Sequence, residues 1–186
     1  MKVKNVFQKR QNLVELLVGK MVRVESEREQ NEAEFKAIYT PTASQVFALA
    51  EQEALRLKSD FIATEHVLFG LVQFGQGIAV NVLRRMGLDL ERVRLEIEES
   101  MTGGDENKKH HPMQLTPAVK KVLVRAQDEA RSLFHGYVGT EHILLGLLSD
   151  DGGVAARILQ DFGVTTAEAR QQVLKELDPN ENWRNA

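Results

Sequence analysis

Apolar and polar positions follow one pattern twice along this chain, at a constant offset of 76 residues without a gap. Each copy opens on a Thr-Pro pair and carries apolar residues at the spacing of an amphipathic helix. Of the 60 pairs that join positions 40–99 to 116–175, 18 are identical. Such self-similarity indicates two copies of one structural unit. A surface site in one copy is therefore expected to have a counterpart in the other.

The periodicity predicts four short helices in each copy. Residues suited to N-cap positions precede three of them: Thr40 and Thr116 the first, Thr64 and Thr140 the second, Asp89 and Thr165 the fourth. Gly87 and Gly163 suit a left-handed C-cap after the third helix. The connections at 61–62 and 137–138 are expected to point inward, and no alternating β pattern competes. The predicted fold class is therefore all-α, a pseudo-two-fold duplicated four-helix repeat with eight helices.

The flanking segments complete the predicted organisation. Repeat one covers 40–100, a polar linker 101–114, repeat two 115–177, and a polar tail 178–186. Residues 1–39 form an N-terminal extension that is predicted to be partly helical. Its apolar residues at helical spacing are Val6, Leu13, Leu17 and Val24. Such a helix could pack on the domain, dock on a partner or lie on a membrane surface, and the acidic run that follows opposes the last.

Composition excludes several classes of protein. The formal net charge of −3 opposes a dedicated nucleic-acid binder, because such proteins usually present a basic face. The absence of cysteine excludes disulfides, thiolate metal sites and cysteine catalysis, and it fits a cytoplasmic location. No apolar run approaches the length needed to span a membrane.

Motifs for catalysis and cofactors are missing from the sequence. It contains no GxxxxGK[ST] loop for nucleotide phosphates, no HExxH metal motif and no GxSxG nucleophile turn. His110 and His111 lie in the polar linker, where a metal would find no rigid set of ligands. We therefore expect a protein that is not an enzyme and has neither a metal nor a cofactor.

Paired acidic residues are the strongest candidates for binding. Glu65 and Glu141 occupy the first turn of the second helix, where a carboxylate either complements the helix dipole or receives a guanidinium. The helix starts at Thr40 and Thr116 leave backbone N–H groups that suit an anion. A carboxylate beside such a helix start would recognise a group that carries both charges. The histidines that follow the two glutamates are expected to bond the neighbouring backbone.

Residues 137–148, which read YVGTEHILLGLL, and their first copy carry a family resemblance. With the Thr-Pro starts and the spaced glycines, they resemble the Clp N domain, most closely that of ClpC-type unfoldases. The resemblance covers residues 39–177. Departures occur at Ala63, where the family usually has glycine, and at 58–60, which replace the usual Gly-His/Asn run.

The resemblance implies a double Clp N motif and a role in Clp-type proteolysis. Such domains bind adaptor proteins, substrates or Clp subunits, and some bind phosphoarginine, a degradation mark. The acid that contacts the guanidinium corresponds to Glu65 and Glu141, with Thr64 and Thr140 beside them, and the phosphate is expected near Thr40 and Thr116. The chain could be a piece of a larger unfoldase or a free-standing relative that binds Clp ATPase or peptidase subunits. The alternative function is a sensor that binds a small ligand in the groove between the repeats.

Overall fold

The computed structural model describes residues 38–101, 114–150 and 152–178. The chain divides into two units, Met1–Ile38 and Tyr39–Ala186, and every helix and strand described belongs to the second. The predicted N-terminal helix, the linker pair His110 and His111 and nearly all of the tail lie outside the described residues.

Eight helices and two very short strands make up the described part, so the all-α prediction is confirmed. The first repeat contains α2 (Pro41–Arg56), β1 (Phe61–Ile62), α3 (Thr64–Phe74), α4 (Ile78–Arg85) and α5 (Leu90–Ser100). The second contains β2 (Gln114–Leu115), α6 (Pro117–Ser132), α7 (Thr140–Leu148), α8 (Val154–Asp161) and α9 (Thr166–Leu177). Each helix of the first repeat therefore has a counterpart in the second.

Local cap residues explain where most of these helices begin and end. Thr40 Oγ1 accepts a hydrogen bond from Ala43 N at 3.1 Å at the start of α2, and Thr116 plays the same part for α6. At the start of α9, Thr165 Oγ1 accepts a hydrogen bond from Glu168 N, and the Thr165 hydroxyl donates to the carboxylate of Glu168. The glycines after α4 and α8 have φ of 85° and 80°, the left-handed conformation expected of them.

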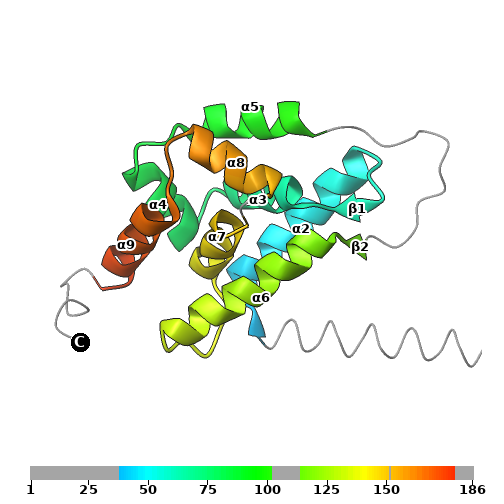
Figure 1. The fold of residues 1–186 in the computed structure, drawn as a ribbon. Helices are drawn as coiled ribbons and strands as arrows, with labels where there is room; N and C mark the ends of the chain where they lie inside the picture. Colours follow the sequence, from blue (N-terminus) through cyan, green and yellow to red (C-terminus); the bar gives the residue numbers. More distant parts are fainter. Residues whose placement is uncertain (1–37, 102–113, 151, 179–186) are drawn as a thin grey trace, which may run out of the picture. The chain divides into compact units, whose positions relative to one another are not determined.

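The third helix of each repeat packs against the other repeat. In Figure 1, α4 lies beside α9, and α8 lies beside α5. The central helices α3 and α7 are buried along most of their length, and α4 and α8 close over α7 and α3 respectively. The two repeats therefore share a single core, as the marginal size of one repeat would require.

Two short parallel pairings, which the sequence did not predict, link the repeats. Ile62 pairs with Leu115, and Tyr39 pairs with Val138 at the equivalent position. Backbone bonds of 3.0 Å follow each pair, from Thr116 N to Ile62 O and from Thr40 N to Val138 O. The segment before the first helix of each repeat thus pairs with the connection between the first and second helices of the other repeat. This pairing places the start of α2 near that of α7.

In each of the connections at 61–62 and 137–138, only one of the two side chains points into the core. Phe61 and Tyr137 are 48% and 43% exposed, while Ile62 and Val138 are buried. The prediction that both residues of each pair point inward is therefore wrong for Phe61 and Tyr137. In an extended segment successive side chains point to opposite faces, so one neighbour must face solvent.

In the described part of the chain, no single helix is long and apolar enough to cross a membrane. Together α3 and α4 would meet the requirement by length and composition, but they are bent by 86° at their junction. The apolar residues of α3 lie in the core of the domain.

Candidate functional site

The hydroxyls of Thr64 and Thr140 do not cap their own helices, so the N-cap prediction for these residues is wrong. The N-cap position belongs in each case to the preceding residue, and the threonine is the first residue of the helix. Thr140 Oγ1 accepts a hydrogen bond from Ala79 N in α4 at 3.3 Å. Thr64 Oγ1 accepts from Ala155 N in α8 at 3.5 Å. Each threonine therefore caps the third helix of the other repeat.

Glycines at the starts of α4 and α8 explain this exchange of caps. Gly77 and Gly153 occupy the N-cap positions and have no side chain to accept a hydrogen bond. The first N–H groups of a helix have no acceptor within it, so an oxygen must come from elsewhere. Both signals were present in the sequence, as a glycine at the start of the third helix and a threonine at the start of the second in each copy. The two lie in different repeats, so their pairing could not be read from neighbouring residues.

His66 and His142 bond the backbone before their helices, as expected from the sequence. His66 Nδ1 accepts from Ala63 N at 3.1 Å, and His142 Nδ1 accepts from Gly139 N at 2.9 Å. Because Nδ1 is the acceptor, the neutral ring carries its proton on Nε2. Burial lowers the pKa of His66, and it lowers the pKa of His142 to about 4, so both rings are neutral near pH 7.

A cluster of His135, Glu141 and His142 brings potential metal ligands within 4.8 Å of one another. His142 Nε2 lies 3.0 Å from His135 Nδ1. Since Nδ1 of His142 already accepts from Gly139, this contact is a hydrogen bond donated by Nε2–H. A histidine that binds a metal through one ring nitrogen usually donates a hydrogen bond from the other. In His142 the other nitrogen, Nδ1, instead accepts a hydrogen bond from Gly139 N. The arrangement therefore suits the orientation of two rings better than the binding of a metal.

Glu141 differs from its counterpart in burial. It is 2% exposed, whereas Glu65 is partly exposed. Burial raises the pKa of Glu141, and among the described residues Oε1 finds no hydrogen-bond partner. Oε1 lies 3.4 Å from His142 Nδ1, but that ring is neutral, so the contact is not an ion pair. A buried carboxylate oxygen without a hydrogen-bond donor is costly and indicates a place where a cationic donor could bind.

A cavity of about 260 Å³ opens beside this carboxylate. Residues of both repeats line it: Thr40, Thr42, Gly77, Ile78, Tyr137, Gly139, Thr140 and Glu141. The sequence suggested that each glutamate lies beside the helix start of its own repeat. Instead, the fold brings Glu141 of repeat two to Thr40 of repeat one. Glu65, Thr64 and Thr116 are not among the residues that line this cavity.

The start of α2 supplies polar groups to the cavity. Ala43 N donates to Thr40 Oγ1, Ser44 N donates to Thr40 O, and Pro41 has no N–H. The N–H of Thr42 therefore remains without an acceptor within the helix. The positive end of the helix dipole lies at the same place. One wall of the cavity thus suits an anion, and the carboxylate of Glu141 on another wall suits a cation.

Comparisons with known proteins agree with this architecture. The family model of the Clp repeat N-terminal domain matches residues 38–146 and 114–184. The negative regulator of genetic competence ClpC/MecB of Bacillus subtilis (strain 168) is 48% identical over 148 residues, which cover 80% of this chain and 18% of that protein. The chain thus spans less than a fifth of the length of this relative.

Solved structures share the fold at lower sequence identity. The N-terminal domain of the chaperone ClpD from Arabidopsis thaliana has a TM-score of 0.58 at 23% identity, and the match covers 77% of this chain and 96% of that one. A ClpV N-domain in complex with a VipB peptide has a TM-score of 0.64 at 16% identity, with 78% and 90% covered. With the family match over both repeats and the level of identity to the relative, the chain belongs to the Clp repeat N-terminal domain family.

Proposed function

We propose that this chain is a non-enzymatic docking module of Clp-type proteolysis. It binds adaptor proteins, substrate proteins or Clp subunits, and it recognises substrates that carry phosphoarginine. Its place of action is the cytoplasm. The observation that carries the proposal is the buried carboxylate of Glu141, whose Oε1 has no hydrogen-bond partner among the described residues and which lines a cavity together with the start of α2.

Phosphoarginine matches the two walls of that cavity. Its guanidinium would donate to the Glu141 carboxylate, and its phosphoryl group would accept from the Thr42 N–H and from the threonine hydroxyls. Charge-assisted hydrogen bonds of this kind are stronger than neutral ones, and a helix start favours a phosphate. A ligand bound in this way would contact both repeats at once.

Binding of a peptide is compatible with this fold. The ClpV N-domain, a structural neighbour, is known in complex with a VipB peptide. In this chain, the exposed ring of Tyr137 borders the cavity and offers apolar surface for the residues next to a phosphoarginine. Affinity would then come from a charged anchor with an aromatic residue at its edge.

The proposal contains no catalytic step. The buried ring of His142, which follows Glu141 in the chain, has its two nitrogens committed to Gly139 and His135. Its lowered pKa makes it a poor base near pH 7. The alternative of a small-ligand sensor is less well supported, because the cavity is smaller than the usual ~300–1,000 Å³ of such sites and three threonines and a carboxylate line it.

A titration of the full chain with phosphoarginine, arginine and inorganic phosphate tests the proposal. We expect phosphoarginine to shift the amide NMR signals of Thr42, Thr140 and Glu141, and either part alone to bind more weakly. Glu141→Gln should weaken phosphoarginine binding by about tenfold or more, since it removes a charged acceptor. Exposed Glu99→Gln is the matched control. If no amide near Glu141 responds to phosphoarginine, the recognition of marked substrates is wrong.

A second measurement addresses the partner proteins. The chain should bind purified Clp ATPase, Clp peptidase or adaptor protein in a defined pairwise assay, with affinity unaffected by Glu99→Gln. Failure with all three classes would contradict the role in Clp-type proteolysis, whatever the outcome with free phosphoarginine.

A further inference from the structure

The surroundings of Glu65 differ from those of Glu141 at three positions that matter for binding. At the offset of 76 residues, Thr42 corresponds to Ala118, Tyr137 to Phe61, and Gly139 to Ala63. The first two changes remove hydroxyl groups, and the third adds a methyl group. Each change makes the counterpart site less polar or less roomy.

The third change controls where the carboxylate can lie. Gly139 has φ −97° and ψ −178°, and Ala63 has nearly the same backbone at −104° and 175°. A Cβ placed on Gly139 would lie only 2.5 Å from both carboxylate oxygens of Glu141. The Glu141 carboxylate therefore occupies the space that a methyl group would fill.

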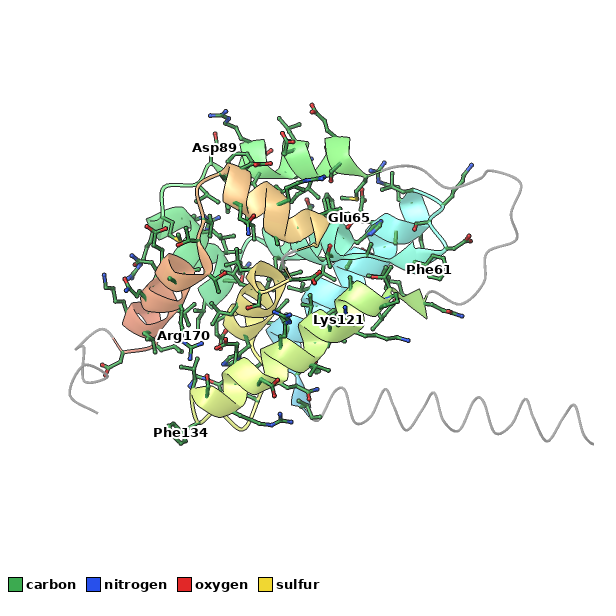
Figure 2. The ribbon with its side chains drawn as sticks, in the orientation of Figure 1. Phe61, Glu65, Asp89, Lys121, Phe134 and Arg170 are labelled. Carbon is green, nitrogen blue, oxygen red and sulfur yellow. The ribbon has the colours of Figure 1, made fainter. Side chains whose placement is uncertain are left out.

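In the first repeat that space is taken by the methyl group of Ala63. Glu65 cannot fold back in the same way, and Figure 2 shows its side chain at the start of α3. Its Oε2 lies 3.3 Å from Thr64 Oγ1, and the residue is partly exposed. Each glutamate is followed by a histidine, whereas the residue two positions before it is alanine in the first repeat and glycine in the second.

Ala118 removes a second component of the site. The start of α6 repeats the start of α2, with Thr116 as N-cap and a proline after it. The residue after that proline is Thr42 in α2, which lines the cavity at Glu141, and Ala118 in α6. An anion at the start of α6 would therefore find the backbone N–H without the adjacent hydroxyl.

We propose that the two pseudo-equivalent sites are unequal, and that residues 63 and 139 decide which one binds. The chain takes one equivalent of phosphoarginine, at the cavity beside Glu141, and Ala63 disables the counterpart beside Glu65. This inference rests on the proposed function, and it adds a stoichiometry and a specificity-determining position.

Calorimetric titration of the full chain with phosphoarginine tests the inequality. The wild-type chain should bind one equivalent, and Gly139→Ala should weaken that binding by about tenfold or more because the carboxylate is displaced. Gly136→Ala is the matched control, since a Cβ there meets no atom within 4 Å, and it should bind like the wild type. Ala63→Gly combined with Ala118→Thr should add a second, weaker equivalent that Glu65→Gln abolishes.

A measurement without ligand gives an independent readout. The carboxyl carbon of Glu141 can be followed by NMR as pH changes, and its raised pKa should fall toward the ordinary value in Gly139→Ala. The extended backbone of Gly139 accepts alanine without strain, so this variant should remain folded. An unchanged pKa would mean that the carboxylate does not need the space above Gly139, which would overturn the steric argument.

The outcomes separate this inference from the proposed function. Two equal equivalents in the wild type, or one equivalent that Glu65→Gln abolishes and Gly139→Ala leaves intact, would overturn the inequality and leave recognition of phosphoarginine standing. The absence of any binding would remove both.

Discussion

Arg94 and Arg170 occupy the same position in the two repeats and make different contacts. Arg170, on α9 and labelled in Figure 2, donates to Glu129 of α6, so an ion pair bridges these two helices. Arg94, on α5, donates instead to Glu98 at 2.6 Å and to a second glutamate of its own helix. Identical residues at identical positions thus link two helices in one repeat and only their own helix in the other.

A groove of about 540 Å³ lies where the first repeat lacks this bridge. It is lined by Leu49, Gln52, Glu53, Arg56, Phe69, Gln73, Arg94 and Glu98. Glu53 corresponds to Glu129, but Arg56 of its own helix holds it at 2.5 Å. Ser132 stands at the position of Arg56 in the second repeat, and Leu174 at that of Glu98. Neighbouring residues therefore decide which partner each charge takes.

The paired glutamates of the candidate site teach the same lesson. Glu141 is buried over a glycine, while Glu65 is kept out by an alanine. In both comparisons the recurring residue has its role set by a neighbour that does not recur. The duplicated pattern therefore predicts where two sites lie but not whether they are equal.

Gly70 and Gly146 lie where α3 and α7 pack closely against the backbones of α2 and α6. Substituting them should have the largest effect on the stability of the fold. A Cβ at Gly146 would lie 2.7 Å from Val122 O, and one at Gly70 would overlap Val46 O. We expect either Gly→Ala change to lower the free energy of unfolding by about 3 kcal/mol, measured by urea denaturation, because the backbone has to move. Gly136→Ala is the control. A loss in only one repeat would mean that the two crossings are not equivalent.

Acid should destabilise the second repeat through the buried ring of His142. The pKa of His142 is about 4 in the folded protein and near 6.5 when unfolded, so its contribution is present above pH 6.5 and lost as pH falls toward 4. This amounts to about 3 kcal/mol by linkage. The raised pKa of Glu141 acts in the opposite direction, so unfolding is best followed in Glu141→Gln. His142→Asn should then flatten the dependence on pH, and an unchanged slope would contradict the neutral buried ring.

Neutralising the glutamates should separate the two sites by stability. Glu141→Gln should raise the free energy of unfolding at pH 7 by about 1 kcal/mol, because a buried carboxylate with an unsatisfied oxygen is removed. Glu65→Gln, at the more exposed position, should have a smaller effect. Thermal denaturation of the two variants beside the wild type gives the comparison. Equal shifts would argue against the difference in burial.

Removal of the two arginines is the finest test. Arg170→Ala should destabilise the protein by about 0.5–1 kcal/mol, the range for partly exposed ion pairs, and less at high salt. Arg94→Ala should cost less, since its contacts stay within one helix. Urea denaturation at two salt concentrations measures both. A larger loss for Arg94 would reverse the assignment of the bridge to the second repeat.

Short-range signals account for what could be predicted from the sequence. The duplication, the period of the apolar residues and the caps at Thr40, Thr116, Asp89 and Thr165 gave the helices and the fold class. Each of these signals acts within a few residues of the chain, through helical periodicity or through a side chain that bonds a nearby N–H. The glutamates and helix starts could be named as candidates for the same reason.

Only the tertiary structure decided how these parts meet. It assigned Thr64 and Thr140 as caps of the other repeat, brought Thr40 to Glu141, and buried one of two equivalent carboxylates. These outcomes depend on atoms from segments far apart along the chain that pack within a few ångströms, and the sequence pattern carries no measure of those distances. A single methyl group, present at Ala63 and absent at Gly139, is too small to alter the pattern but large enough to displace a carboxylate.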